Sequence, residues 1–232
     1  MANQTTPKDV AIVLAGGSGS RMQSDVPKQF LPLGGKPVIT YALSAFENSA
    51  VDEIVLVSSA EGLDRCRDIV AQYHFRKVTH IISGGAERYD SVYAALRRIT
   101  QADYVYVQDG ARPFVTPELI AGMREAVRSE KAVVAAMPVK DTIKVADALG
   151  YAVNTPDRST LWQIQTPQVF AWDLLWDAYT RMMQVEHADV TDDAMVVERY
   201  TDQRVKLYPA FYRNIKITTP EDLIVAESYL KM

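Results

Sequence analysis

Residues 10–30 of the chain read VAIVLAGGSGSRMQSDVPKQF. The first five, from Val10 to Leu14, form an apolar run typical of a buried strand. Three glycines and two cations follow the run, namely Gly16, Gly17, Gly19, Arg21 and Lys28. Because glycine has no Cβ, backbone N–H groups can close around phosphate oxygens, and cations neutralise the charge that the amides leave. The stretch therefore predicts a strand and a polyphosphate-binding loop at its carboxyl end, where open α/β sheets bind ligands.

The loop differs from two familiar phosphate-binding motifs. No Gly-Lys-Ser/Thr follows the glycines, and the G-x-G-x-x-G dinucleotide pattern is missing. The glycines could instead make only a turn beside solvated cations, and glycines alone do not decide between the two interpretations. The pairing of Arg21-Met22 with Pro27-Lys28-Gln29 at this spacing favours phosphate binding.

Composition narrows the class of protein. The chain has 232 residues, of which 48% are apolar and 23% charged, a profile typical of a soluble globular protein with one sizeable core. Its formal net charge of −4 argues against a nucleic-acid-binding surface. An anionic substrate must therefore be met by locally placed arginine and lysine.

Other features indicate where the protein works. Cys66 is the single cysteine, so no internal disulfide can form and a reducing cytoplasm is expected; its Arg65 and Arg67 neighbours suggest a solvated helix face, not a catalytic thiol. Residues 1–9 are polar, which predicts no signal peptide, and no apolar window has the length of a membrane span. The three histidines are scattered, which disfavours a zinc site.

Alternating apolar runs and helical patterns predict an α/β fold with a largely parallel sheet. The expected strands are 10–14, 53–58, 78–82, 104–108, 132–137, 161–164, 205–208 and 215–217. The expected helices are 38–46, 62–73, 88–99, 117–129, 171–183, 192–199 and 220–230. Thr-Pro-Glu at 116–118 and again at 219–221 has the residues of a capped helix start.

Residues 140–158, KDTIKVADALGYAVNTPDR, interrupt the alternation. Two short alternating strands flank Leu149-Gly150, which predicts a protruding hairpin. An isolated two-stranded hairpin is marginally stable in water, so a second subunit is expected to cover it. We therefore expect residues 1–232 to form one domain, with a dimerisation arm at about 140–158.

Two further strand ends carry candidate site residues. In YVYVQDGARP, residues 104–113, Asp109 ends a strand and could hold Mg²⁺ against a triphosphate, although an Asp-Gly turn is the ordinary interpretation. In SGGAERYDS, residues 83–91, backbone groups near Gly85 could contact a base while Ser91 reaches the nucleotide. A β–α turn with a capping acid explains the second stretch almost equally well.

A final set of side chains suits a second, phosphorylated substrate. Thr142 and Arg158 lie on the arm, and Lys216 lies in RNIKITTP, residues 213–220. The planar fork of arginine suits phosphate, but each of these residues taken alone would be assigned to the surface. Thr166-Pro167-Gln168 and Thr191-Asp192-Asp193 resemble a loop and a helix cap and predict no catalytic role by themselves.

Together these motifs closely resemble the 2-C-methyl-D-erythritol 4-phosphate cytidylyltransferase family of the non-mevalonate isoprenoid pathway. The resemblance runs from Val10 to the last expected helix. It is carried by A-G-G-S-G-S-R-M, P-K-Q-F, G-G-x-E-R-x-D-S-V, D-G-A-R-P, P-V-K-D-T-I-K, T-P-D-R, Q-T-P-Q-V-F, T-D-D-A and N-I-K-I-T. It implies a Rossmann-like three-layer nucleotidyltransferase fold, a mostly parallel twisted sheet flanked by helices with a protruding hairpin. It also implies transfer of CMP from CTP to methylerythritol phosphate, with pyrophosphate as the leaving group.

The resemblance also implies roles for individual residues. The catalytic cations fall on Arg21, Lys28 and Lys216, and the metal-holding aspartate for Mg²⁺ falls on Asp109. Nucleotide contacts fall on Ala15, Gly16, Gly17, Gly19, Gly85, Ser91 and Asp109. Contacts with the acceptor phosphate fall on Arg112, Thr142, Arg158 and Lys216. The family is homodimeric, so Thr142 and Arg158 would serve the active site of the neighbouring subunit.

The sequence departs from the family pattern at two places. Many members read A-A-G where this chain has Ala15-Gly16-Gly17, and many carry an acid where it has Ala86. The second departure leaves a side-chain contribution to cytosine selection open. A ribitol 5-phosphate cytidylyltransferase is the nearest alternative, disfavoured by D-G-A-R-P and T-P-D-R. A non-catalytic nucleotide-binding regulator would be expected to have lost some of the cations that are present here.

Overall fold

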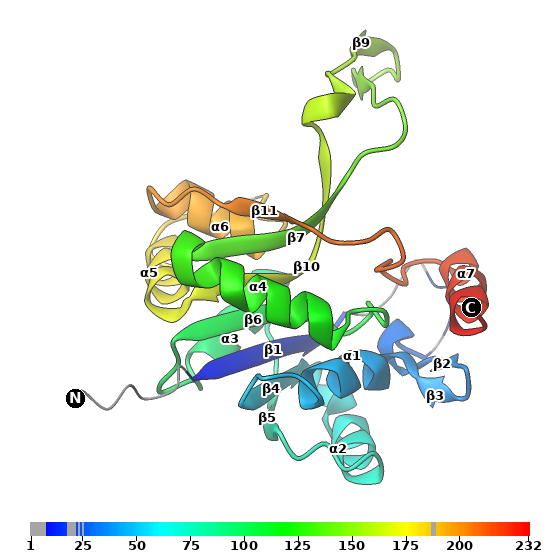
Figure 1. The fold of residues 1–232 in the computed structure, drawn as a ribbon, viewed down its shortest axis with the longest axis vertical. Helices are drawn as coiled ribbons and strands as arrows, with labels where there is room; N and C mark the ends of the chain where they lie inside the picture. Colours follow the sequence, from blue (N-terminus) through cyan, green and yellow to red (C-terminus); the bar gives the residue numbers. More distant parts are fainter. Residues whose placement is uncertain (1–7, 18–21, 23, 25, 187–188) are drawn as a thin grey trace.

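The computed structural model describes residues 8–17, 22, 24, 26–186 and 189–232. This part of the chain forms a seven-stranded sheet in the order β11-β7-β10-β6-β1-β4-β5 (Figure 1). The strands are β1 (Asp9–Ala15), β4 (Glu53–Ser58), β5 (Val78–Ser83), β6 (Tyr104–Asp109), β7 (Ala132–Pro138), β10 (Trp162–Ala171) and β11 (Lys206–Pro209). Among these described strands only β10 runs antiparallel to its neighbours, β6 and β7. The expected α/β fold with a mostly parallel sheet is confirmed.

Helices cover both faces of the sheet. They are α1 (Val38–Glu47), α2 (Leu63–Gln72), α3 (Arg88–Leu96), α4 (Pro117–Glu130), α5 (Trp172–Met182), α6 (Asp193–Tyr200) and α7 (Pro220–Leu230). Helices α1, α2 and α4 contribute to one apolar core, and α3, α5 and α6 contribute to the core on the opposite face. These two helical layers and the sheet give the expected three layers.

The strand β1 shows why this sheet must be covered twice. Ala11 and Val13 pack into the first core, whereas Val10 and Ile12 pack into the second. All four side chains are fully buried, because successive residues of a strand point to opposite faces. The continuous apolar run seen in the sequence is therefore the pattern of a strand enclosed by helices on both sides.

Both Thr-Pro-Glu segments begin helices, as predicted. The Thr116 side chain accepts a hydrogen bond from the Leu119 N–H, a contact that typically contributes about 1 kcal/mol to helix stability. At α7 the Asp222 carboxylate accepts from the Thr219 N–H at 2.9 Å. Both helix starts are therefore stabilised by hydrogen bonds between residues that are close in the sequence.

Two of the expected strands differ from the structure. The strand expected at 161–164 extends to Ala171, as β10, and includes the 166–168 segment that we expected to be a loop. The strand expected at 215–217 is wrong, because this segment is irregular. Ile217 is buried in a third apolar cluster with Ala226 of α7, and its N–H donates to the Ala111 carbonyl at 2.9 Å. Its apolar pattern reflects this burial and not a strand pairing.

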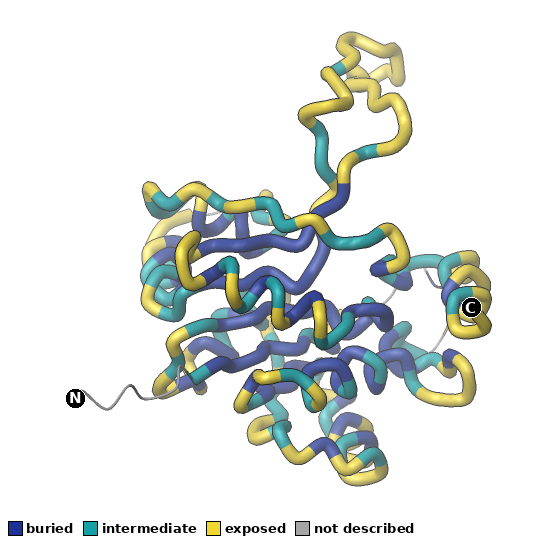
Figure 2. Tube along the Cα trace, viewed as in Figure 1, coloured by how far each residue is buried: buried dark blue, intermediate teal, exposed yellow. Residues whose placement is uncertain are grey.

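Residues 140–158 project from the sheet as the predicted hairpin (Figure 1). Strands β8 (Val145–Ala146) and β9 (Ala152–Asn154) pair antiparallel, and Gly150 turns the chain with a φ of +86°. The arm is exposed along almost its whole length (Figure 2). Its exposed apolar side chains include Val145, Leu149 (82% exposed) and Val153.

The structure also describes two features noted in the sequence, the length of its apolar helices and the environment of Cys66. Within the described residues, no helix is long and apolar enough to cross a membrane. Cys66 is fully buried in α2, and burial raises the pKa of its thiol. This side chain therefore packs as a core residue. Arg65 is exposed, as expected, but its guanidinium also stacks over the Phe30 ring at 4.8 Å from the centroid.

Candidate active site

A cavity of about 230 Å³ lies where β1 and β6 end. It is lined by Leu14, Gly16, Gly17, Lys28, Gln29, Gly85, Ala86, Glu87, Arg88, Ser91, Asp109, Ala111 and Lys216. These residues come from five separate stretches of the chain. The cavity has the position expected for a ligand site in an α/β sheet, beyond the carboxyl ends of parallel strands.

The register of β1 against β6 brings the glycine loop beside Asp109. Leu14 pairs with Asp109 across the two strands, and the Gly110 N–H donates to the Leu14 carbonyl at 2.8 Å. A Cβ at Gly110 would lie 2.8 Å from that carbonyl oxygen, so the close approach requires glycine. On the other side, the buried Gln29 side chain donates to the Ala15 carbonyl at 2.5 Å. The end of β1, where the loop begins, is therefore fixed by hydrogen bonds from both Gly110 and Gln29.

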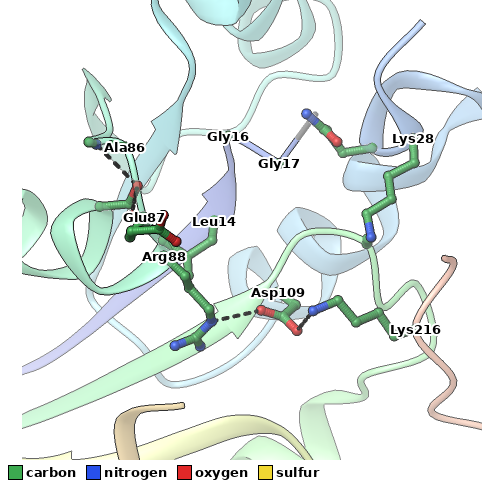
Figure 3. A pocket seen from close by; sticks show the side chains of 13 residues that line it. Leu14, Gly16, Gly17, Lys28, Ala86, Glu87, Arg88, Asp109 and Lys216 are labelled. Atoms are coloured by element: carbon green, nitrogen blue, oxygen red, sulfur yellow. Dashed lines mark hydrogen bonds and ion pairs between the residues drawn. The ribbon is translucent and has the colours of Figure 1, made fainter. Parts of the chain in front are cut away.

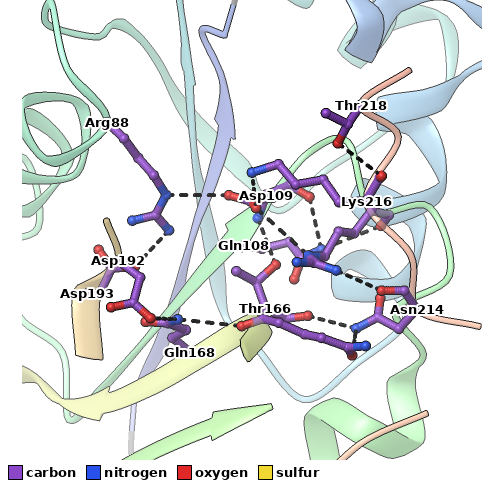
Figure 4. A network of polar contacts seen from close by, with 12 residues as sticks. Arg88, Gln108, Asp109, Thr166, Gln168, Asp192, Asp193, Asn214, Lys216 and Thr218 are labelled. Carbon is purple, nitrogen blue, oxygen red and sulfur yellow. Dashed lines mark hydrogen bonds and ion pairs between the residues drawn. The ribbon is translucent and has the colours of Figure 1, made fainter. Parts of the chain in front are cut away.

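Three cations surround the Asp109 carboxylate (Figures 3 and 4). Lys216 Nζ lies 2.7 Å from Oδ2, Arg88 Nε lies 3.5 Å from Oδ1, and Arg112 Nε lies 3.8 Å from Oδ2. Burial by itself would raise the pKa of the Asp109 carboxyl, but the three cations, Arg88 foremost, outweigh it and hold the pKa well below its usual range. Asp109 is therefore ionised at neutral pH.

Residues of β10 and of the 211–218 segment hold this cluster in place through hydrogen bonds. Thr166 Oγ1 accepts from the Asp109 N–H at 3.1 Å, and Arg112 donates to the Asn214 carbonyl at 2.8 Å. The fully buried Asn214 side chain donates to the Gln165 side chain and to the Thr166 carbonyl, both at 2.9 Å. Thr166 thus takes part in fixing Asp109, a role that we did not predict for it.

Sequence reasoning also missed Arg88, the first residue of α3. Its Nη2 donates to Asp193 Oδ2 at 2.8 Å, while Nε faces Asp109. The Tyr179 hydroxyl donates to the other oxygen of Asp193 at 2.6 Å, and both residues are fully buried. Arg88 stands in the motif G-G-x-E-R-x-D-S-V and Asp193 in T-D-D-A, but nothing in either motif pairs them, because the two residues lie 105 positions apart.

The Gly85–Ser91 stretch forms the expected turn with a capping acid, and Gly85 and Ser91 also line the first cavity. Ser91 Oγ accepts from the Gly85 N–H and donates to the Glu87 carbonyl, each at 3.2 Å, so the loop folds back on the helix. Glu87 caps α3 in a capping box with Asp90, whose carboxylate accepts from the Glu87 N–H at 3.1 Å. The capping acid and the cavity-lining loop are therefore parts of one turn.

A second cavity of about 220 Å³ adjoins the first. It is lined by Arg88, Asp109, Arg112, Ile164, Gln165, Thr166, Gln168, Thr191, Asp192 and Lys216. Arg88, Asp109 and Lys216 line both cavities. The ion cluster is therefore the boundary between two spaces, one on the glycine-loop side and the other over β10.

The structure brings together most of the expected site residues. Those that line a cavity are Gly16, Gly17, Lys28, Gly85, Ser91, Asp109, Arg112 and Lys216. Figure 3 shows Lys28 extending toward the side of the cavity where Lys216 meets Asp109. Ala15 is the last residue of β1, and Gly19 and Arg21 lie outside the described residues.

The two arm residues are the exception. Thr142 and Arg158 are exposed and are not among the described residues that line either cavity. Arg158 instead donates to the Lys140 carbonyl at the base of the arm, at 2.7 Å. Within one chain these side chains do not join the site, and their expected role toward a neighbouring subunit stays a prediction.

Among the described residues, no group of three or more His, Cys, Asp or Glu side chains could hold a metal ion by itself. Asp109 is the carboxylate that lines both cavities, while Glu87 lines only the first and Asp192 only the second. Mg²⁺ commonly takes one or two carboxylates and completes its shell with water and substrate phosphates. The donor set therefore fits a metal that arrives with a polyphosphate and does not fit a metal held by protein alone.

Known proteins resemble this chain over nearly its full length. The family model for IspD, 2-C-methyl-D-erythritol 4-phosphate cytidylyltransferase, matches residues 10–232. A protein of that name from Lachnospira eligens is 56% identical, covering 96% of this chain and 99% of its own. Another from Lachnoclostridium phytofermentans is 44% identical, covering 97% of each chain.

Solved structures agree. The 4-diphosphocytidyl-2C-methyl-D-erythritol synthase of Anaerococcus prevotii superimposes with a TM-score of 0.86 at 34% identity, covering 97% of each chain. The 2-C-methyl-D-erythritol 4-phosphate cytidylyltransferase of Thermus thermophilus gives a TM-score of 0.76 at 28% identity, covering 95% of this chain and 98% of its own. The fold is that of a nucleotidyltransferase. Within that class, the chain belongs to the 2-C-methyl-D-erythritol 4-phosphate cytidylyltransferase family.

Proposed function

We propose that this protein transfers CMP from CTP to 2-C-methyl-D-erythritol 4-phosphate, giving 4-diphosphocytidyl-2-C-methyl-D-erythritol and pyrophosphate. Family membership supports the reaction, and one observation in the structure supports how it proceeds. Lys216 lies in the wall shared by two cavities, one below the glycine loop and one over β10. A nucleotide in the first cavity and a phosphorylated acceptor in the second would meet at this lysine.

The chemistry needs no covalent enzyme intermediate. An oxygen of the acceptor phosphate attacks the α-phosphorus of CTP, and the bond between that phosphorus and the bridging oxygen of pyrophosphate breaks. A phosphate monoester has a second pKa of about 6, so the nucleophile is largely a dianion at neutral pH and requires no general base. The main obstacle is the approach of this dianion to a highly charged triphosphate.

The cations of the site would offset that repulsion. Lys28 and Lys216 line the first cavity, and Arg112 lines the second. They can neutralise the triphosphate, the acceptor phosphate and the charge that develops on pyrophosphate, while the loop holds the reacting groups in line. Arg21 is assigned to the same task from its motif alone, because it lies outside the described residues.

The rim of the first cavity would select the base. Backbone groups at Gly85 can contact the cytosine edge, and Ser91, one turn into α3, can reach the nucleotide. The side chain at position 86, also in the cavity wall, is a methyl group and offers no hydrogen bond to the base. We therefore assign base selection to backbone groups of this turn.

The proposed cofactor is Mg²⁺, held by Asp109 together with phosphate oxygens of CTP. When bound, the ion would neutralise phosphate charge and help to orient the triphosphate. Asp109 Oδ2 now contacts Lys216 at 2.7 Å, so this contact must loosen for the carboxylate to face an ion. The ammonium released in this way would be available to phosphate.

We propose that the acceptor site is completed by the arm of a second copy of this chain. Thr142 and Arg158 are exposed on an arm that carries exposed Val145, Leu149 and Val153, a surface suited to burial against another subunit. Closed twofold dimers are the commonest assembly of soluble proteins. The mass in solution tests this, and a stable monomer with full activity would contradict it.

The reaction is tested by measuring pyrophosphate release from CTP and Mg²⁺, with methylerythritol phosphate and ribitol 5-phosphate as parallel acceptors. We expect strong release with methylerythritol phosphate alone. Release only with ribitol 5-phosphate would keep the cytidylyl chemistry and overturn the acceptor. Tight CTP binding without release for either acceptor would overturn the catalytic proposal and favour a regulatory nucleotide-binding protein.

A further inference from the structure

Both arginines of the ion cluster around Asp109 have partners outside the cavities: Arg112 donates to the Asn214 carbonyl, and Arg88 is held by a second carboxylate. Arg88 contacts Asp109 through Nε and contacts Asp193 through Nη2. Asp193 is fully buried and lines neither cavity among the described residues. The far end of Arg88 is therefore held by a group that substrates cannot reach.

The anchor itself is rigid. Asp193 is the first residue of α6, where its second oxygen accepts from Tyr179, a fully buried residue of α5. The Gln168 side chain of β10 accepts from the Ala194 N–H at 2.9 Å and so ties the start of α6 to the sheet. Three elements of the fold thus fix the carboxylate that holds Arg88.

Lys216 contrasts with Arg88. Its side chain is 37% exposed and lies in the shared wall of the two cavities, where phosphates would bind. Lys216 holds one oxygen of Asp109 and Arg88 faces the other (Figure 4). If the Lys216 ammonium moves from Asp109 to a substrate phosphate, Arg88 stays beside the Asp109 carboxylate, because Asp193 holds its guanidinium.

We propose that Arg88 is a positioning residue: anchored by Asp193, it holds the Asp109 carboxylate in place when Lys216 moves to substrate phosphate. The inference rests on the proposed cytidylyl transfer and adds a residue to it. Arginine suits the task because its planar fork can contact two carboxylates at once, whereas a lysine ammonium is a compact point charge.

The test compares Arg88→Gln, Arg88→Lys and Asp193→Asn with Arg97→Gln, which makes the same charge change at an exposed position just after α3. For Arg88→Gln we expect kcat to fall about tenfold or more, since partners that orient a metal-binding carboxylate commonly matter by this factor. The KM for CTP should change less, because the glycine loop is untouched. Arg88→Lys should restore part of kcat, and Asp193→Asn should show the same pattern more weakly.

A second readout does not depend on turnover. Mn²⁺ is titrated into each variant with CTP but without acceptor, and bound metal is followed by its paramagnetic signal. Arg88→Gln should weaken metal binding to the protein–CTP complex about tenfold. Thermal unfolding reports the folded fraction, so a loss of kcat matched by loss of folded protein would assign Arg88 a purely structural role and overturn the inference.

The two proposals can fail separately. If the unaltered protein releases no pyrophosphate with either acceptor, the proposed function fails. If it is active and Arg88→Gln matches Arg97→Gln in both kcat and Mn²⁺ binding, only the positioning role fails. If Arg88→Gln does not fold, Arg88→Lys and Asp193→Asn decide, and normal values in both would overturn the inference.

Discussion

At the scale of the residue, position decides what a charge does in this protein. Arg124 and Asp9 form an ion pair of 2.5 Å at the opposite end of β1 from the site, with Tyr106 donating to the same oxygen. Asp9 is fully buried, and neither residue of this pair is among the described residues that line the two cavities. The pair of Lys216 and Asp109 is similar in chemistry but opens onto two cavities, so its partners can exchange with ligands.

Replacing Lys28 tests the proposal that cations of the site neutralise the charge of the phosphates. Replacing it by alanine removes one cation from the first cavity and leaves the backbone of the loop intact. We expect Lys28→Ala to lower kcat by about two orders of magnitude, the effect usual for a group that stabilises developing charge. Lys36→Ala, at an exposed position of β3 (Lys36–Pro37), is the matched control and should leave kcat unchanged. Near-normal turnover of folded Lys28→Ala would contradict the mechanism.

At the scale of the element, the irregular 211–218 segment joins the arm to the site. Tyr212 donates to the Pro138 carbonyl at 2.9 Å, and Lys140 Nζ lies 3.4 Å from the centroid of its ring. Two residues further on, buried Asn214 holds β10, and Lys216 follows. The base of the arm and the shared lysine therefore depend on the same short stretch of chain.

Replacing Tyr212 should accordingly lower kcat/KM for the acceptor more than it changes the KM for CTP. We expect Tyr212→Ala to lower kcat/KM for the acceptor about two- to fivefold, because a cation–π contact at an exposed site contributes about 0.5–1 kcal/mol to holding the arm. Tyr212→Phe keeps the ring over Lys140 and should lose less. The KM for CTP serves as the internal control, since Tyr212 is not among the described residues lining the first cavity. An equal loss for both substrates would contradict a role of Tyr212 that acts through the arm.

At the scale of the whole molecule, the arm and the two cavities of one chain lie apart. The cavities lie at the sheet, whereas the arm, which contains Thr142 and Arg158, projects away from it (Figure 1). In the dimer that we propose, the arm of each copy would bring Thr142 and Arg158 to the pocket of the other.

Mixing two inactive variants tests this arrangement. Lys28→Ala damages the pocket and Arg158→Ala damages the arm, so each homodimer should have little activity. A mixed dimer contains one intact pocket served by one intact arm, and an equal, fully exchanged mixture should recover about a quarter of normal activity. Recovery requires that subunits exchange, which unfolding and refolding the two variants together ensures.

The same mixture has a clear negative outcome. If each arm served the pocket of its own chain, no combination of these two variants would contain an intact site. Activity would then stay at the level of the separate variants. Mixing Lys28→Ala with Lys28→Ala carrying a tag is the matched control and should recover nothing under either arrangement.

Much of the fold follows from local signals in the sequence. The apolar run of β1, the Thr-Pro starts of α4 and α7 and the turn at Gly150 each depend on neighbours a few residues apart. The first-cavity residues Gly16, Lys28 and Asp109 could be predicted for a related reason. Parallel strands end at one edge of a sheet, so residues that follow such strands must meet there.

The rest depends on contacts between distant parts of the chain. The direction of β10, the irregular course of residues 215–217 and the pairing of Arg88 with Asp193 have no local pattern, because each is decided by burial against elements far away in sequence. The sequence alone therefore determined most of the strands, the place of the glycine loop after β1 and the nature of the chemistry. Only the tertiary structure decided which carboxylates face which cations, since burial and ion pairing depend on distances that no short stretch of sequence contains.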